Sequence, residues 1–132
     1  MRAILALAVL LGTAGWTATA QAACEDVRSG WIADSFQISA GELMTLTDIG
    51  LAAYMLGYTQ GLLISVRTGS DRACVDDLAR CTRGQSTAEL VNRLRRYVSN
   101  DPTLRDDLAS RVTFDAIFGP CYARLQEQEH DG

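Results

Sequence analysis

The chain has 132 residues and a formal net charge of −4, with 12 basic and 16 acidic side chains. A net negative charge disfavours nucleic acid and anionic membranes as partners, so we expect neither. The length suits a single domain with a modest hydrophobic core.

Residues 1–22 have the pattern of a signal peptide. A positive start at Arg2 is followed by an apolar core over residues 3–11, and Ala20 and Ala22 form a small-x-small cleavage site. Cleavage after Ala22 leaves a mature chain whose second residue is Cys24. A lipoprotein signal also places a cysteine there, but it requires a branched aliphatic residue where this chain has Gln21. We therefore favour export without lipidation.

After cleavage the chain keeps four cysteines, Cys24, Cys74, Cys81 and Cys121. An even number in a small exported chain predicts two disulfides, and three pairings are possible. Structural zinc is the other common use of four cysteines. The spacing contains no C-x2-C pair, so we predict no metal site.

The first mature segment, residues 23–38, is predicted to be an irregular or extended arm. Its apolar anchors are Trp31, Ile32 and Phe36. Ser39 and Glu42 then form a capping box, which predicts a helix start at Ala40. Asp48 is a candidate N-cap for a second start, so residues 40–67 form either one bent helix or two.

The stretch from Ile49 to Val66 carries no charge, and its apolar residues recur at the steps of one helix face. Gly57 and Gly61 lie inside it, and each weakens a helix by ~1 kcal/mol relative to alanine. A helix that keeps both glycines needs close backbone contact, so we expect another helix to cross here. The run is long enough to span a bilayer and contains a GxxxG pattern. Its polar residues nevertheless favour a buried core helix, and we expect no membrane span.

Residues 68–85 break this pattern and indicate a long loop with a short, partly helical piece between Cys74 and Cys81. Long connections are commonly functional or covalently tied down. Ser86 and Glu89 form a second capping box, which starts an amphipathic helix with arginines on its polar face. Those arginines are either a docking patch or, as is commoner, a solvated helix face.

Asp101 and Pro102 end that helix and start the next, as N-cap and first-turn proline. Gly119 and Pro120 are expected to stop the last helix, and residues 123–132 form a polar tail that we expect to be frayed. The expected architecture of residues 23–122 is all-α, a small disulfide-stapled bundle of about four helices.

No constellation of catalytic residues stands out. The one histidine, His130, lies in the polar tail, and cysteines held in disulfides are not nucleophiles. The acidic pairs at 76–77 and 106–107 are adjacent in sequence, so on a helix they diverge rather than converge. We predict that the protein is not an enzyme and needs no cofactor.

The chain presents a recognisable order of landmarks. They are Gly57-Tyr58-Thr59-Gln60-Gly61, Cys81, the helix end at Tyr97-Val98, the break at Asp101-Pro102 and the closing Pro120-Cys121. This order, over residues 48–121, resembles the Rap1a/Tai family of type VI secretion immunity proteins, which are small all-helical domains. The chain departs from the family in an extra cysteine pair, Cys24 and Cys74, and in a longer first loop.

The resemblance implies a periplasmic protein that binds a secreted toxic effector, in the best-known branch a peptidoglycan amidase. Inhibition would come from a protruding loop that occludes the effector's cleft, with no chemistry by the inhibitor. The resemblance also implies homodimers. Finally, it implies a disulfide from Cys81 to Cys121, which leaves Cys24 to pair with Cys74.

Two connections suit a cleft-blocking element, residues 68–85 and the turn at 99–102. A loop that is ordered beforehand loses less entropy on binding, so we favour the first. The expected partner contacts are Arg72, Asp76, Asp77 and Arg80, with Asn100 and Asp101 in reserve. The alternative is that these charges only keep the loop soluble.

Two other functional classes fit the same sequence. One is an acid-stress holdase of the small, disulfide-bonded periplasmic type, loosened by protonation of its carboxylates. The other is an assembly factor of the envelope. A toxin gene beside this one would favour immunity, whereas client protection at low pH would favour the holdase.

Overall fold

The structure is a computed structural model that describes residues 17–34, 37–65 and 69–130. Its helices are α1 (Thr17–Asp34), α2 (Ala40–Met44), α3 (Asp48–Ser65), α4 (Gly69–Thr82), α5 (Thr87–Asn100), the 3-10 helix η1 (Pro102–Asp106) and α6 (Ala109–His130). No strand occurs in these ranges, and one antiparallel bridge joins Ser39 and Leu108. The predicted all-α, disulfide-stapled fold is confirmed, although these ranges hold more than the expected number of helices.

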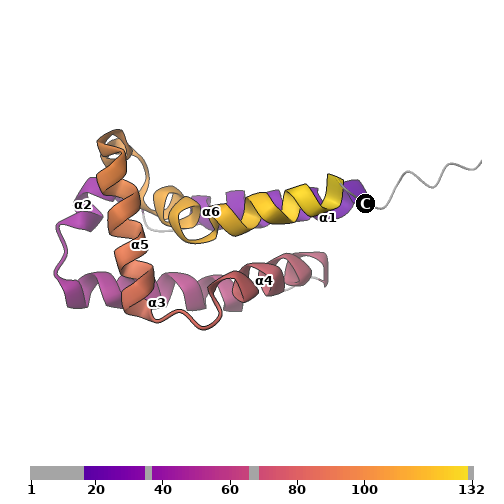
Figure 1. Cartoon of the computed structure of the whole chain (residues 1–132), viewed down its shortest axis with the longest axis horizontal. Coiled ribbons are helices and arrows are strands. Elements are labelled where there is room, and N and C mark those ends of the chain that lie inside the picture. The colour runs from indigo at the N-terminus through magenta and orange to yellow at the C-terminus, as the bar shows by residue number, and fades with distance from the viewer. Residues whose placement is uncertain (1–16, 35–36, 66–68, 131–132) are drawn as a thin grey trace, which may run out of the picture.

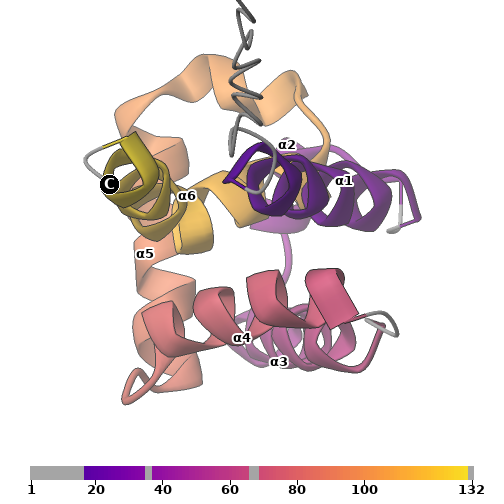
Figure 2. The same ribbon diagram turned by 90° about the vertical axis from the view of Figure 1, so that its right-hand side faces the viewer.

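The helices form two layers (Figure 1). One layer contains α1 and α6 side by side, and the other contains α3 and α4, as the turned view in Figure 2 shows. α5 runs across one end and packs against both α3 and α6. α4 contacts α1 and α6 in the opposite layer, so the hydrophobic core lies between the layers.

α3 is the central helix of this core. Leu51, Met55, Tyr58 and Leu62 recur at helical spacing and are all buried. The Tyr58 hydroxyl donates a hydrogen bond to the Ser110 carbonyl oxygen at 2.6 Å, and burial raises the pKa of this phenol well above its usual value. Within the described residues, no helix combines the length and apolar character that a bilayer span requires.

The two glycines of α3 have different surroundings. A Cβ at Gly61 would lie 2.8 Å from the Cη2 atom of Trp31 on α1, so a side chain packs directly on this glycine. A Cβ at Gly57 would meet nothing within 4 Å, because Gly57 faces solvent. The prediction of a crossing helix is therefore wrong at Gly57, and at Gly61 the close contact comes from an aromatic ring rather than from backbone.

Local capping explains where several helices start. Both predicted capping boxes are formed, at the starts of α2 and α5, and the hydrogen bonds lower the pKa of the two glutamates involved, Glu42 and Glu89. Residues 40–65 form two separate helices rather than one bent helix. The N-cap of α3 is Thr47, whose hydroxyl accepts from the Gly50 N–H at 3.1 Å, and not Asp48 as predicted.

Two segments predicted to lack regular structure are helices. The expected irregular arm at 23–38 lies largely in α1, and the expected loop at 68–85 lies largely in α4. Ile32 of α1 is buried and Trp31 packs against the core, as expected of anchors, whereas Phe36 lies outside the described residues. α1 begins at Thr17, inside the predicted leader, and cleavage after Ala22 stays a prediction.

The last part of the chain also differs from expectation. Asp101 caps the short η1, with its carboxylate accepting from the Thr103 N–H at 3.1 Å, and the last helix begins only at Ala109. The prediction that it ends at Gly119 and Pro120 is wrong, because α6 continues to His130. The tail at 123–132 is therefore helical as far as it is described.

α6 passes a proline that would ordinarily end or kink a helix. Pro120 has no N–H, so the Ala116 carbonyl loses its usual intrahelical donor. The residues just beyond it are held from outside the helix. Cys121 is joined to α4 by a disulfide, and the Tyr122 hydroxyl donates to the Glu25 carboxylate of α1 at 2.9 Å. These tertiary contacts outweigh the local breaking signal.

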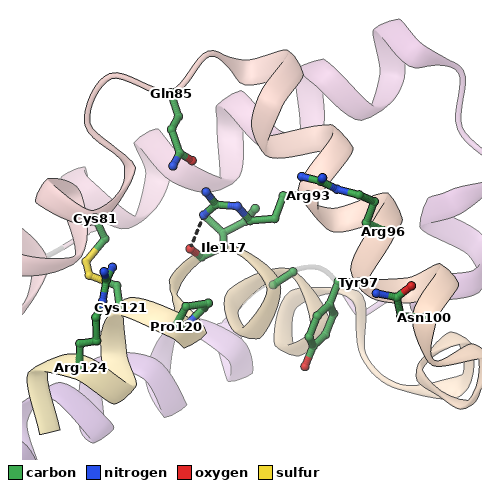
Figure 3. Close-up of a pocket in the computed structure, with 11 residues that line it drawn as sticks. Cys81, Gln85, Arg93, Arg96, Tyr97, Asn100, Ile117, Pro120, Cys121 and Arg124 are labelled. Atoms are coloured by element: carbon green, nitrogen blue, oxygen red, sulfur yellow. Dashed lines mark hydrogen bonds between the residues drawn. A yellow bond between two sulfur atoms is a disulfide. The ribbon is translucent and has the colours of Figure 1, made fainter. Parts of the chain in front are cut away.

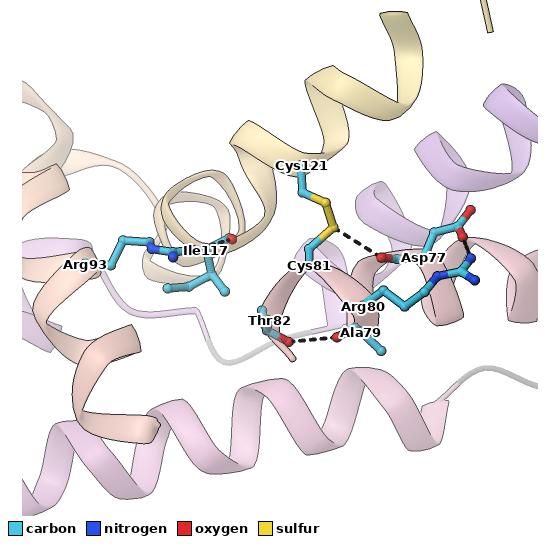
Figure 4. Close-up of a disulfide and its surroundings, with 8 residues drawn as sticks. All are labelled: Asp77, Ala79, Arg80, Cys81, Thr82, Arg93, Ile117 and Cys121. Atoms are coloured by element: carbon cyan, nitrogen blue, oxygen red, sulfur yellow. Dashed lines mark hydrogen bonds and ion pairs between the residues drawn. A yellow bond between two sulfur atoms is a disulfide. The ribbon is translucent and has the colours of Figure 1, made fainter. Parts of the chain in front are cut away.

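Two disulfides tie α4 to both ends of the described chain. Cys24 of α1 bonds Cys74 with a Cα–Cα distance of 5.3 Å, and Cys81 bonds Cys121 of α6 with a Cα–Cα distance of 5.8 Å (Figure 4). This is the pairing that the family resemblance implied. Two such bridges indicate an oxidising, extracytoplasmic environment. The Cys24 sulfur is used in the bridge, which excludes a lipid thioether on that atom.

Candidate partner-binding site

The four predicted contacts of the 68–85 segment lie on α4. Arg72, Asp76 and Arg80 are exposed, and Asp77 is half-buried. Asp77 and Arg80 form an ion pair one turn apart, close to the Cys81–Cys121 disulfide (Figure 4). These charges are therefore carried by a helix that is covalently held at two points, not by a loop.

Asn100 and Asp101, the two reserve contacts, lie at the C-terminal end of α5. Asp101 uses its carboxylate to cap η1, where it also accepts from the Thr103 hydroxyl at 2.6 Å. Asn100 is exposed and lines a surface groove together with Cys81, the last of the α4 cysteines. None of the four α4 contacts lines that groove, so the structure separates the two predicted groups.

The groove lies between α5, α6 and the connection from α4 to α5, and has a volume of about 540 Å³ (Figure 3). We name it the arginine groove. Its lining residues are Cys81, Gln85, Arg93, Arg96, Tyr97, Asn100, Ala116, Ile117, Pro120, Cys121 and Arg124. Its floor is formed partly by apolar atoms of α6 and its walls by long polar side chains of both helices.

Positive charge dominates this groove. Arg93 and Arg96 come from α5 and Arg124 from α6, and no acidic residue is among the lining residues. Arg93 donates to the Ile117 carbonyl oxygen at 3.2 Å, which fixes one guanidinium N–H against α6. In the described part of the chain, Arg96 and Arg124 make no ion pair.

The neighbouring arginine of α5 is used differently. Arg95 faces away from the groove and forms an ion pair with Asp48 at the start of α3. That contact ties two helices together and neutralises the charge. Arg95 is therefore paired with an acid outside the groove, whereas Arg93 and Arg96 line the groove and Arg93 is held there by the Ile117 carbonyl.

A buried amide oxygen also belongs to the arginine groove. The Gln85 Oε1 atom is buried and has no hydrogen-bond partner in the structure. A buried acceptor left without a donor costs about 1–3 kcal/mol, so folded proteins keep few of them. Gln85 lies on the connection between α4 and α5 and its amide end is directed toward Arg93 (Figure 3).

A second hollow of about 450 Å³ adjoins the groove, because Tyr97 and Pro120 line both. Its polar residues include Glu25 and Arg28 of α1 and Asp115 of α6, and Arg28 donates to the Asp115 carboxylate at 3.0 Å. Burial raises the pKa of Tyr97, and the carboxylates of Asp115 and Asp101 raise it further. The phenol at the junction is therefore neutral and able to donate a hydrogen bond.

These two hollows offer charge, hydrogen bonds and apolar surface rather than reactive groups. The arginine groove contains no carboxylate, imidazole or thiol, since its two cysteines form a disulfide. Among the residues described, no cluster of histidine, cysteine or acidic side chains has the size that a metal ion needs. His130 is the last residue of α6, and its side chain lies outside the description. The arginine groove is suited to binding an anionic partner, whereas the second hollow carries the carboxylates of Glu25 and Asp115 beside Arg28.

Sequence reasoning found part of this site. The arginines of α5 were recognised as either a docking patch or a solvated face, and Asn100 was a candidate contact. Arg124 and Gln85 were missed. Arg124 was assigned to a frayed tail because Pro120 was expected to end the helix, and Gln85 carries no signal in the sequence that would reveal its buried oxygen.

Comparisons of the chain with protein-family models, with curated proteins and with solved structures gave no match.

Proposed function

We propose that this protein is an immunity-type inhibitor that binds a secreted toxic effector protein and occludes its active-site cleft. The observation that carries the proposal is the position of α4. This helix presents exposed charges, and its two cysteines are bonded to α1 and α6. A binding element braced in this way loses little conformational entropy when it docks, which is what an inhibitor without chemistry of its own requires.

Two features support the proposed location of this protein, the leader-like N-terminal residues and the two disulfides. The leader-like residues 1–22 support export, and two disulfides suit an oxidising compartment. We propose the periplasm, where an immunity protein would meet an effector that attacks the cell wall. The resemblance of residues 48–121 to the Rap1a/Tai family supports this assignment, and a peptidoglycan amidase is the effector that it suggests.

The test starts from the genes that flank this one, which should encode the toxin. The toxin should co-purify with the protein. Exchanging the charges of α4 with Asp76→Lys and Arg80→Glu should weaken binding about tenfold without lowering the melting temperature, because exposed charge pairs contribute little to folding. A matched control, Arg105→Glu with Asp106→Lys, changes the same charges on the exposed η1 and should bind normally.

Two results would count against the proposal. Unchanged affinity for the α4 double variant would place the contact surface elsewhere on the protein. No binding to any neighbouring toxin, together with protection of unfolded client proteins at low pH, would favour the holdase instead.

We also propose that the protein forms a homodimer through α3. One face of this helix carries large apolar side chains that the structure leaves in solvent. Their exposed fractions are Ile49 82 %, Leu56 47 %, Leu63 47 % and Ile64 74 %. They lie at helical spacing around the exposed Gly57, so a second helix can approach closely. Contiguous exposed apolar surface of this kind commonly marks a protein interface.

A further inference from the structure

We infer that the arginine groove is a recognition site for an acidic peptide segment of a protein partner, bound in an extended conformation. The inference concerns a different surface from the charged face of α4, and it does not require that the partner be a toxin. It rests on the charges of the groove, on one buried hydrogen-bonding atom and on the continuity of the groove with the second hollow.

The charges indicate a carboxylate ligand. The chain as a whole is acidic, with a net charge of −4, yet Arg93, Arg96 and Arg124 converge on a groove whose lining has no acid. A guanidinium group has five N–H donors in a planar fork that matches a carboxylate, so an Arg–carboxylate pair is both strong and directional. The donors of Arg96 and Arg124 have no acidic partner in the described part of the chain.

The buried Gln85 amide distinguishes a peptide from an isolated carboxylate. Its Oε1 atom needs a donor, which a deprotonated carboxylate cannot supply and a peptide N–H can. If the amide is turned so that its nitrogen takes this position, it needs an acceptor, which a peptide carbonyl supplies. An acidic peptide therefore satisfies both the arginines and Gln85 in either orientation of the amide, whereas an isolated carboxylate supplies an acceptor only.

The size of the surface also favours a peptide. The arginine groove and the second hollow have volumes of about 540 Å³ and 450 Å³ and meet at Tyr97 and Pro120. One carboxylate or phosphate would fill only a small part of this surface. An extended segment that places its acidic residues among the arginines would continue across the Tyr97 ring, which offers an apolar face and a hydroxyl donor. The part that enters the second hollow would be uncharged, because Glu25 and Asp115 line it.

The probe for this site is a fluorescein-labelled peptide of about ten residues, long enough to span both hollows. Glutamate and serine alternate in one half, for the arginine groove, and the other half is serine alone, so that no glutamate meets Glu25 and Asp115 of the second hollow. Serine keeps the peptide from binding the apolar face of α3. The control peptide has glutamine in place of glutamate. Binding is measured by fluorescence anisotropy with the oxidised protein. The glutamate peptide should bind, the glutamine peptide should not, and affinity should fall as salt screens the charges.

The matched variants remove two charges each. Arg96→Gln with Arg124→Gln should weaken binding of the glutamate peptide about tenfold, since each exposed ion pair contributes up to about fivefold. Arg105→Gln with Arg111→Gln removes the same charge from exposed positions outside both hollows and should leave affinity unchanged. In an NMR titration, the side-chain amide signals of Gln85 should shift more with the glutamate peptide than with acetate, which has no donor for the Gln85 oxygen.

Several results would overturn the inference. Equal loss of affinity in both double variants would show that net charge alone attracts the peptide. Competition by inorganic phosphate as effective as that by unlabelled peptide, at matched ionic strength, would make the groove a small-anion site. Binding to phosphatidylglycerol vesicles without binding to the peptide would assign it to a membrane surface. Because no toxin is used, these outcomes are independent of whether the immunity function is correct.

Discussion

Gly57 and Gly61 lie one turn apart on α3 and differ in what surrounds them. Gly57 is open to solvent, whereas Gly61 has the Trp31 ring against it, and that ring also contacts Tyr58 edge-on with a centroid separation of 5.5 Å. Trp31 thus packs on two neighbouring residues of α3. The same residue type therefore has a packing role at one position and none at the other.

This difference predicts opposite outcomes for the same substitution. Gly57→Ala should stabilise the protein by up to ~1 kcal/mol, because alanine is the better helix former and its Cβ meets nothing. Gly61→Ala gains the same helix propensity but displaces Trp31, and overpacking costs about 1–3 kcal/mol. Urea unfolding of both variants should show Gly61→Ala no more stable than the parent. Equal stabilisation by the two alanines would contradict this packing.

At the residue scale, short-range signals were predictable and long-range ones were not. The pairs Ser39–Glu42 and Ser86–Glu89 start helices because both partners lie within one turn. Asp48 has the chemistry of an N-cap, but its carboxylate pairs with Arg95 of α5, and the adjacent Thr47 takes the capping role. Only the tertiary structure shows that Arg95 is within reach of Asp48.

At the element scale, α1 and α4 are the two helices whose segments were predicted to be an irregular arm and a loop. Cys24, Val27 and Trp31 of α1 share one face and pack on the core, but Ser29 and Gly30 interrupt the apolar pattern between them. α4 begins with Gly69 and further turn-forming residues, which indicated a loop. Both helices receive much of their stability from the core and the disulfides, and such contributions leave little trace in local sequence.

The two disulfides of α4 should therefore strongly affect how well this helix is ordered. Replacing Cys24 and Cys74 with serine, or Cys81 and Cys121 with serine, should each cost ~2–5 kcal/mol of unfolding free energy. The sequence separations of 50 and 40 residues differ too little to matter, by only ~0.2 kcal/mol in loop entropy. Chemical denaturation measures both costs, and hydrogen exchange should show faster exchange in α4 than in α3.

The reference for that experiment is α3, which contains no cysteine. If either double-serine variant lost protection equally in α3 and α4, the bridges would stabilise the whole domain rather than hold α4 in particular. If neither variant lost stability, the bridges would be dispensable, and the rigid-element argument for the proposed function would lose its support.

At the scale of the whole molecule, the exposed face of α3 should determine the oligomeric state. We expect two chains per particle in light scattering coupled to size-exclusion chromatography. Leu56→Glu should yield single chains, because a carboxylate would be buried without a partner in the dimer interface. Its effect on the folding of the monomer should be within ~0.5 kcal/mol, since Leu56 is already 47 % exposed.

Asn92→Glu is the control for that variant, because it adds the same charge at an exposed position of α5. It should leave the dimer intact. A parent protein that is already a single chain at micromolar concentration would contradict the dimer and leave the apolar face of α3 for a different protein.

The all-α architecture could be predicted from the long uncharged run of α3, the helix that also carries the exposed apolar face. An uncharged run as long as α3 has to be covered, and its buried face is covered by α1, α4, α5 and α6. Periodicity therefore identified the core helix and the all-α class. It did not identify which helices cover it, because Trp31 of α1 lies in the segment predicted to be an irregular arm and α4 lies in the segment predicted to be a loop.

The disulfides have one further consequence, which concerns the order in which they form. The pairing is consecutive along the chain: the first cysteine bonds the second, and the third bonds the fourth. A chain that crosses a membrane N-terminus first presents Cys24 and then Cys74 to the oxidising side, before Cys81 and Cys121 arrive. An oxidase that joins each pair as it emerges makes both native bridges directly. If the chain is exported as proposed, its oxidative folding should depend on a disulfide oxidase and proceed normally in a strain that lacks the disulfide isomerase.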